Sequence, residues 1–144
     1  MNAYCDTSFL VSLYTLDGNS EVAAQKLRAR SSAALILSRL GELELTNAFQ
    51  QRIFRREFTA PQIRAAHKLF AADLAEGILA FKPVEADAVY LRGLRLARKW
   101  TSTMGARTLD LLHVAIALEM GMDGIFTFDK LQSKVCRGEG LRVF

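Results

Sequence analysis

The sequence predicts an α/β domain with a mostly parallel central sheet that is flanked by helices. Short apolar segments alternate along the chain with longer segments of helical periodicity, which is typical of strand–helix–strand units. No linker, repeat or low-complexity tract divides the 144 residues, so we expect a single domain over residues 1–144. The chain is 51% hydrophobic and 24% charged, which excludes a disordered chain and a small disulfide scaffold.

Apolar runs and helical spacing define the elements of the first half of the chain. In chain order they predict a strand at Ala3–Cys5, a helix at Phe9–Leu16, a helix at Glu21–Arg30, a strand at Ala33–Leu37 and a helix at Glu42–Phe58. The segment from Asp17 to Ser20 is typical of a turn that also offers a helix N-cap. Ser38 can cap the helix that follows it.

The second half repeats the alternation. It predicts a helix from Pro61 to about Glu76, a strand at Ile78–Lys82, a helix at Glu85–Trp100, a loop at Thr101–Gly105, a helix at Leu109–Met120, a strand at Gly124–Phe128, a helix at Lys130–Cys136 and a strand at Leu141–Phe144. Thr59 and Thr108 are the expected N-caps of two of these helices. Gly77 and Gly121 are expected to end the same two helices.

Several classes of protein are excluded by what the sequence lacks. Its longest uncharged apolar run, Leu111–Leu118, has eight residues, whereas a membrane-spanning helix needs about 18. The first residues show no secretory signal, and the two cysteines, Cys5 and Cys136, are too few for a disulfide framework, so we expect a cytoplasmic protein. The net charge of +4 is a mild bias toward anionic partners.

Four acidic residues fall where an α/β sheet binds its ligands, beyond the carboxyl ends of the strands. Asp6 follows the first predicted strand, and Asp129 follows the strand predicted near Phe128. Glu44 lies in the first turns of the helix after the second strand. Asp110 lies in the first turn of the apolar helix that precedes the fourth strand. We therefore expect these carboxylates to converge at one edge of the sheet.

Each acid also has a structural explanation. Asp6 and Asp129 could be helix N-caps, worth about 1 kcal/mol each. Asp110 could simply interact with the helix dipole near the N-terminus of its helix. Its neighbours are apolar, however, and burying a carboxylate among them without a partner would be costly. Helical periodicity alone does not decide between Glu44 and Glu42. His113, one turn beyond Asp110, is expected to be a packed and hydrogen-bonded histidine rather than a general base.

Four segments carry a family resemblance that spans the chain. They are Tyr4-Cys5-Asp6-Thr7-Ser8-Phe9-Leu10, Ser38-Arg39-Leu40-Gly41-Glu42-Leu43-Glu44-Leu45, Arg107-Thr108-Leu109-Asp110-Leu111-Leu112-His113-Val114-Ala115 and Phe126-Thr127-Phe128-Asp129. In this order they resemble the motifs of PIN-domain proteins, specifically of VapC-type toxins from prokaryotic toxin–antitoxin pairs. The spacing from Ser38 resembles the family pattern for Glu44 and not for Glu42. Two departures are Gly41, where many relatives have a hydroxyl residue, and the lack of a second acid soon after Asp129.

The resemblance implies a PIN-like three-layer sandwich and a metal-dependent endoribonuclease that acts as a toxin. It also implies an RNA substrate, an antitoxin partner and a homodimer. A site made only of carboxylates suits Mg²⁺ or Mn²⁺ rather than Zn²⁺. We expect Asp6 and Asp110 to be the primary ligands, with Glu44 and Asp129 binding a second ion or orienting water.

Three further residues are candidates around the acids. Ser8 and Thr127 are expected to hydrogen-bond the metal-binding carboxylates. Arg107, three residues before Asp110, is expected to contact substrate phosphate.

Two other functions remain open at this point. The first is a catalytically degenerate PIN domain that binds RNA or protein without cleaving it. The second is a phosphatase of the haloacid dehalogenase type, whose second acid follows two residues after the first. Ser8 occupies that position here, which counts against the phosphatase.

Overall fold

A computed structural model of the chain describes residues 1–30 and 33–144. Its strands are β1 (Ala3–Cys5), β2 (Leu35–Leu37), β3 (Leu79–Phe81), β4 (Gly124–Phe126) and β5 (Arg142–Val143). They form one sheet in the order β3-β2-β1-β4-β5, and each described pair of neighbours is parallel. The predicted α/β class is confirmed, and the sheet, expected to be mostly parallel, is parallel throughout the described part of the chain.

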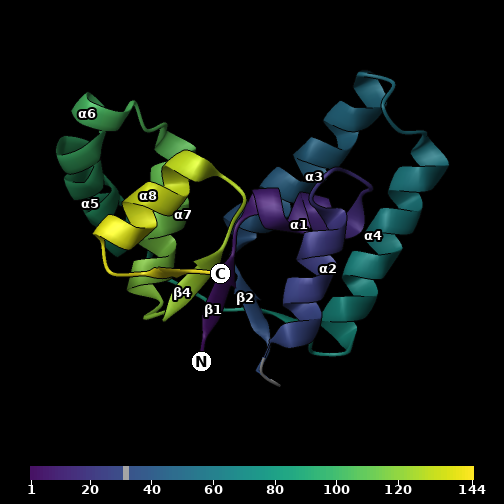
Figure 1. Cartoon of the computed structure of the whole chain (residues 1–144), viewed down its shortest axis with the longest axis horizontal. Helices are drawn as coiled ribbons and strands as arrows, with labels where there is room; N and C mark the ends of the chain where they lie inside the picture. The colour runs from purple at the N-terminus through teal and green to yellow at the C-terminus, as the bar shows by residue number, and fades with distance from the viewer. Residues whose placement is uncertain (31–32) are drawn as a thin grey trace.

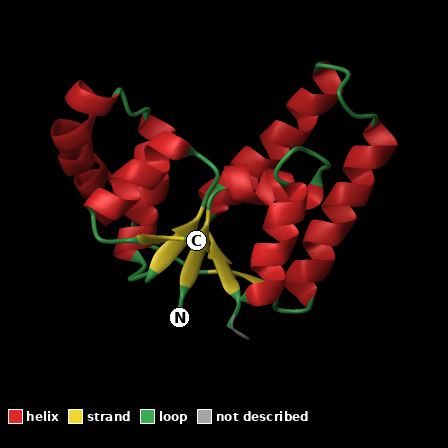
Figure 2. Cartoon of the chain, viewed as in Figure 1, coloured by secondary structure: helices red, strands yellow, loops and turns green. Residues whose placement is uncertain are grey.

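Helices cover both faces of this sheet (Figure 1). One side carries α1 (Thr7–Tyr14), α2 (Ser20–Ala29), α3 (Arg39–Phe54) and α4 (Ala60–Ala75); the other carries α5 (Ala86–Leu96), α6 (Ser102–Met104), α7 (Thr108–Glu119) and α8 (Lys130–Gly138). Figure 2 shows the strands between the two groups of helices, which spread apart beyond the carboxyl ends of the strands. Among residues 1–30 and 33–144, no helix combines the length and the apolar character that a membrane crossing requires.

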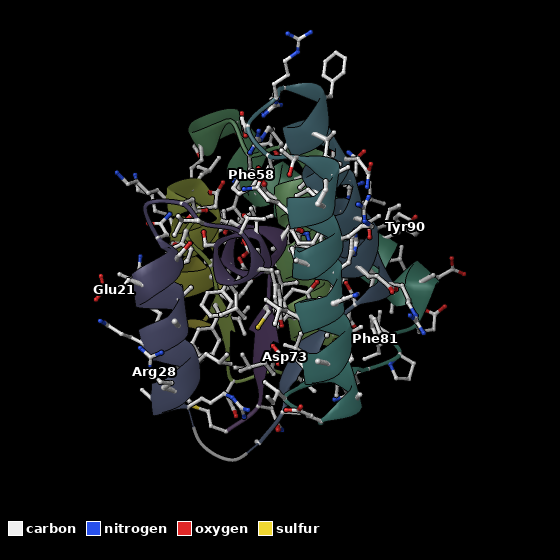
Figure 3. All side chains as sticks on the ribbon, turned by 90° about the vertical axis from the view of Figure 1, so that its right-hand side faces the viewer. Glu21, Arg28, Phe58, Asp73, Phe81 and Tyr90 are labelled. Carbon is white, nitrogen blue, oxygen red and sulfur yellow. The ribbon has the colours of Figure 1, made fainter. Side chains whose placement is uncertain are left out.

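The alternation of side chains along the strands creates two hydrophobic cores. Ala3 and Cys5 of β1 lie in the core under α1 to α4, whereas Tyr4 lies in the core under α5, α7 and α8. Neighbouring residues of a strand point to opposite faces, so a short strand can serve both cores. Glu21 and Arg28 face outward on the outer side of α2, as Figure 3 shows.

The predicted helix ends are partly confirmed. Ser38 caps α3 by accepting a hydrogen bond from the Gly41 N–H at 3.1 Å. Thr59 and Gln62 form a reciprocal capping box at the start of α4. Gly121 follows α7 with φ of 65°, a left-handed conformation that favours glycine.

Two predictions near the start of α7 are wrong. The Thr101–Gly105 segment is helical up to Met104, because a π-helical turn at Ala97–Thr101 leads into α6. Tertiary contacts outweigh the loop-like composition here: the Trp100 indole donates to Glu139 at 2.8 Å and packs against Gly138. Thr108 is the first residue of α7 rather than its cap, and the Arg107 side chain in the cap position makes no capping hydrogen bond.

The strand order places a binding position at the middle of the sheet. The chain runs outward from β1 through β2 to β3 and then returns to β4 on the other side of β1. The crevice beyond the carboxyl ends of the strands where such an order reverses is the usual ligand site of open α/β sheets. Because Cys5 of β1 pairs with Phe126 of β4, Asp6 lies level with Thr127 at this position.

Candidate active site

Asp6 is the most buried of the four candidate acids, with 3% of its surface exposed. It caps α1 by accepting a hydrogen bond from the Phe9 N–H at 2.9 Å. Its two oxygens also accept hydrogen bonds from Ser8 at 2.8 and 2.9 Å, and one accepts from Thr127 at 2.6 Å. The structural explanation for Asp6 is therefore real, but it does not account for the two hydroxyl donors that surround the carboxylate.

Asp110 and Asp129 both lie close to the guanidinium group of Arg107. Arg107 Nε donates to Asp110 at 2.9 Å, and a terminal nitrogen of the same guanidinium lies 3.8 Å from Asp129. Asp129 also caps α8 by accepting from the Gln132 N–H at 2.7 Å. Arg107, predicted as a contact for substrate phosphate, here pairs with acids, and its side chain is 76% exposed.

Gln132 ties α8 to α7 beside these two acids and was missed by sequence reasoning. Its side-chain amide donates to the backbone carbonyl of Asp110 at 3.2 Å, although the residue is almost fully buried. Its Oε1 is the one buried side-chain polar atom that lacks a hydrogen-bond partner within the described residues. The only sequence signal for this residue is its place three positions after Asp129, in the first turn of α8.

Glu44 points to the site, whereas Glu42 does not. Glu44 Oε2 accepts a hydrogen bond from Thr7 at 2.8 Å and is also in hydrogen-bond contact with His113 Nε2. Glu42 instead pairs with Arg39 at 2.8 Å on the surface. This is the arrangement expected for two residues that are two positions apart on a helix, about 200° of rotation.

His113 is the buried histidine that the sequence led us to expect, and it lies in a polar network. Its Nδ1 lies 2.7 Å from the Tyr4 hydroxyl, which in turn lies 2.8 Å from Ser38 Oγ. Tyr4 and His113 are 0% and 3% exposed. Thr7 and Tyr4 were not selected from the sequence, because a hydroxyl beside an acid and an aromatic residue in a strand carry no spacing signal.

The environments shift the pKa values of two of these acids in opposite directions. Burial raises the pKa of Asp6, and the hydrogen bonds from Thr127, the Phe9 N–H and Ser8 offset this only in part. Burial also acts to raise the pKa of Glu44, but the hydrogen bond with His113, the electrostatic attraction of the same ring and the hydrogen bond from Thr7 outweigh it and hold this pKa below its usual range. A nearby cation would lower the pKa of Asp6.

Shared neighbours link Asp6, Asp129 and Asp110 in pairs without forming a ready-made metal cluster. Thr127 connects Asp6 to Asp129, since its Oγ1 donates to Asp6 and accepts from the Asp129 N–H at 3.0 Å. Within residues 1–30 and 33–144, no group of three or more histidine, cysteine, aspartate or glutamate side chains is arranged to hold a metal ion.

The donor chemistry nevertheless fits a hard divalent cation. All four candidate ligands offer carboxylate oxygens, the ligands that Mg²⁺ and Mn²⁺ prefer. The Arg107 guanidinium stands where a cation would serve Asp110 and Asp129 together, so both carboxylates already share one positive group.

Comparison with known proteins decides the family. The PIN domain family matches residues 3–138 of the sequence, almost the whole chain. The chain belongs to the PIN domain family. The four motif segments that resembled this family lie within the matched range, so the PIN-domain assignment from sequence is confirmed. A comparison with curated proteins finds no significant match.

Solved structures with the same fold include three chains of low sequence identity. VapC20 from Mycobacterium tuberculosis, described as a toxin that cleaves the sarcin–ricin loop, is 20% identical, with a TM-score of 0.63 over 92% of this chain and 94% of that one. FitAcB from Neisseria gonorrhoeae is 17% identical, with a TM-score of 0.67 over 99% of this chain and 96% of that one. PAE2754 from Pyrobaculum aerophilum is 16% identical, with a TM-score of 0.63 over 99% of this chain and 90% of that one. These similarities show the fold.

Proposed function

We propose that this PIN domain is a Mg²⁺- or Mn²⁺-dependent endoribonuclease and the toxin of a toxin–antitoxin pair. The observation that carries the proposal is the position of Asp6, Glu44, Asp110 and Asp129 at one edge of the sheet, where the strand order reverses. The description of VapC20 as a toxin that cleaves the sarcin–ricin loop supports the choice of RNA as substrate. A cytoplasmic location suits such a substrate.

The residues divide the work of the site between them. Asp6 and Asp110 are the proposed primary ligands, and Glu44 and Asp129 complete the set or orient water. When bound there, a divalent cation would lower the pKa of a coordinated water and stabilise charge on the scissile phosphate. Ser8 fixes the orientation of the Asp6 carboxylate, because its hydroxyl contacts both oxygens. A fixed carboxylate loses less entropy when it binds its ligand.

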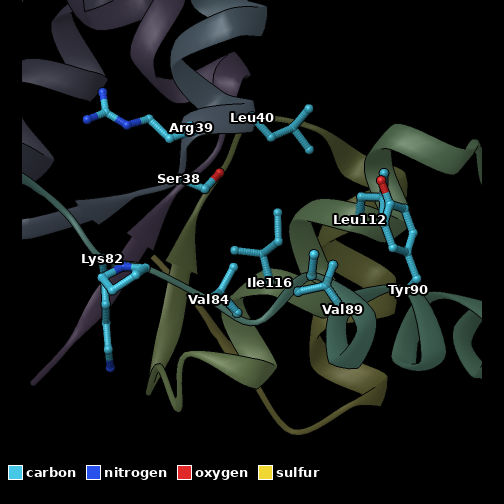
Figure 4. Close-up of a pocket in the computed structure, with 11 residues that line it drawn as sticks. Ser38, Arg39, Leu40, Lys82, Val84, Val89, Tyr90, Leu112 and Ile116 are labelled. Atoms are coloured by element: carbon cyan, nitrogen blue, oxygen red, sulfur yellow. The ribbon is translucent and has the colours of Figure 1, made fainter.

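Protein partners are the second part of the proposal, namely an antitoxin and a second copy of this chain. An exposed apolar surface on α5 supports it, since Tyr90, Leu91 and Leu94 are 62%, 62% and 52% exposed. Beside them lies a hollow of about 410 Å³, whose wall includes Leu112 and Ile116 (Figure 4). Contiguous exposed apolar surface of this kind is typical of protein interfaces.

The direct test measures cleavage of a labelled RNA with Mg²⁺, with Mn²⁺ and with excess chelator. Cleavage should require the metal and should be lost in Asp110→Asn. The matched control is Asp87→Asn, because Asp87 also lies in the first turn of a helix but is exposed and outside the site. Cleavage that persists undiminished in chelator would contradict the metal mechanism. Equal loss in both variants would mean that Asp110 serves its helix rather than the reaction.

A catalytically degenerate PIN domain remains the second candidate. The observation in its favour is that Arg107 already pairs with Asp110 and Asp129, so two of the acids are satisfied without a metal. This candidate predicts binding of RNA in a mobility-shift assay with no cleavage product at any Mg²⁺ concentration, and equal affinity in Asp110→Asn.

A further inference from the structure

Gln132 makes hydrogen bonds to both acids on one side of the candidate site. Its backbone N–H donates to the Asp129 carboxylate at 2.7 Å, and its side-chain amide nitrogen donates to the backbone carbonyl of Asp110 at 3.2 Å. Asp129 is the N-cap of α8, and Asp110 lies in the first turn of α7. One residue therefore connects the two helix starts that carry the two carboxylates.

The chemistry of the amide determines which end of it faces α7. A backbone carbonyl oxygen can only accept a hydrogen bond, so the nitrogen of the Gln132 amide must face Asp110. No donor within residues 1–30 and 33–144 reaches the other end of the amide, Oε1. Turning the amide over would place two acceptors, the Gln132 oxygen and the Asp110 carbonyl, against each other. The amide is therefore only half satisfied by the protein.

This arrangement is costly for a side chain that is so deeply buried. Gln132 is only 2% exposed, and a buried polar atom without a partner lowers the stability of the folded state. The buried face of α8 also includes Val135 and Cys136, which belong to the hydrophobic core. An unbranched apolar side chain of similar length, such as that of methionine, could fill the same space without an unpartnered oxygen. Packing alone therefore favours an apolar residue at position 132.

The link that Arg107 makes between the same two acids is weaker. Its side chain is 76% exposed, and its terminal nitrogen lies 3.8 Å from Asp129, beyond hydrogen-bond distance. Exposed ion pairs of this kind contribute little to stability and are screened by salt. The separation of Asp110 and Asp129 thus depends more on the buried Gln132 than on Arg107.

We propose that Gln132 is a positioning residue of the active site, which sets the separation of Asp110 and Asp129 so that both can serve the same metal site. This inference rests on the proposed function, because it takes the two acids to be metal ligands. The amide of Gln132 bonds to the main chain of Asp110 and leaves its carboxylate free. The backbone N–H bonds to Oδ1 of Asp129, whereas Oδ2 faces Arg107. Gln132 therefore holds both acids in place and leaves each with an oxygen for a cation.

A positioning role and a structural role predict different effects of an apolar substitution. If the amide serves the fold, its removal lowers stability, and any loss of metal binding follows from that. If the amide serves the site, its removal keeps or raises stability, because a buried unpartnered oxygen disappears, and metal binding still weakens.

The test is Gln132→Met, with two measurements that need no RNA. The free energy of unfolding, measured with urea in chelator, should equal that of the wild-type protein or exceed it. The affinity for Mn²⁺ alone, measured from the EPR signal of the free ion, should fall by about 10-fold, the scale seen when a residue that orients metal ligands is removed. Cleavage of a labelled RNA at subsaturating Mn²⁺ should fall with it.

The matched control is Thr15→Val. Thr15 is also buried, and its hydroxyl also donates to a helix carbonyl, that of Val11 at 2.7 Å, but at the opposite end of α1 from Asp6. We expect the reverse pattern from this control. Its free energy of unfolding should fall, because a satisfied buried hydrogen bond is lost, and its Mn²⁺ affinity should not change.

The inference and the proposed function fail in different ways. A loss of stability in Gln132→Met, or a failure to fold, would show that the amide serves the fold, and it overturns the positioning role. Wild-type Mn²⁺ affinity and cleavage in a stable Gln132→Met overturn it as well, and both results leave the nuclease proposal intact. If the wild-type protein itself binds no Mn²⁺ and cleaves no RNA, the nuclease proposal fails and the positioning role fails with it.

Discussion

The two sides of the candidate site hold their acids by different means. On one side, Glu44 accepts a hydrogen bond from the half-buried Thr7 and is in hydrogen-bond contact with the buried His113. On the other side, Asp110 and Asp129 share the guanidinium of Arg107, whose side chain is mostly exposed. A hydrogen-bond network that reaches into the interior fixes geometry, whereas an exposed ion pair is weak and is screened by salt.

This difference indicates how such a site can be both stable and open to a metal. The Glu44 carboxylate is half-buried, and its pKa is held below the usual range by its contacts with His113 and Thr7. The Asp110 and Asp129 side is neutralised by an exposed arginine, which the proposed divalent cation would displace at little cost. The negative charges of Asp110 and Asp129 are thus compensated by Arg107 in the metal-free protein.

The largest effect is expected from Glu44→Gln on the buried side. A neutral amide is a poorer ligand for Mg²⁺ than a carboxylate, so RNA cleavage at saturating metal should fall by orders of magnitude. Glu42→Gln on the same helix is the matched control and should change stability by no more than about 0.5 kcal/mol and cleavage very little. A dead Glu42→Gln beside an active Glu44→Gln would reverse the assignment of the two residues.

A smaller effect is expected from Arg107→Gln on the exposed side. If Arg107 stands in for the cation, its removal should tighten Mg²⁺ binding by about two- to five-fold, the scale of an exposed ion pair. Arg39→Gln is the matched control, because Arg39 also pairs with an acid three residues later, and its side chain is 75% exposed. Unchanged Mg²⁺ affinity together with a raised KM for RNA would favour the role first predicted for Arg107, contact with substrate phosphate.

The fold was largely predictable because its signals are local. Apolar runs such as Ala3–Cys5 and the capping residues Ser38 and Thr59 mark strands and helix starts within a few residues of sequence. The helical conformation of Ser102–Met104 was not predictable in this way. Its stability depends on Trp100 reaching Glu139, a contact that no local pattern contains.

In the candidate site, too, the features that depend on local sequence were predictable and those that depend on tertiary contacts were not. The positions of Asp6 and Asp129 after neighbouring strands follow from strand order, and Ser8 lies on the same turn as Asp6. The pairing of Arg107 with Asp129 and the contact of His113 with Tyr4 bring together residues from different elements. Side chains that meet only after the chain has folded leave no spacing by which to recognise them.

The smallest expected effect concerns pH and compares Asp6 with Glu44 in the metal-free protein. The pKa of Asp6 is raised above 3.8, so the folded state binds more protons at this residue and its contribution to stability falls as pH rises through that window. The pKa of Glu44 is lowered below 4.5, so its contribution grows as pH rises toward that value.

The free energy of unfolding, measured with urea in chelator from about pH 3 to about pH 7, should therefore change with opposite slopes when each acid is neutralised. Relative to wild type, Asp6→Asn should gain stability with rising pH and Glu44→Gln should lose it. Altered hydrogen bonds shift each curve by a nearly constant amount, so the slopes isolate the ionisation. Slopes of the same sign would mean that burial at Asp6 and the contacts of Glu44 do not shift the two pKa values in opposite directions.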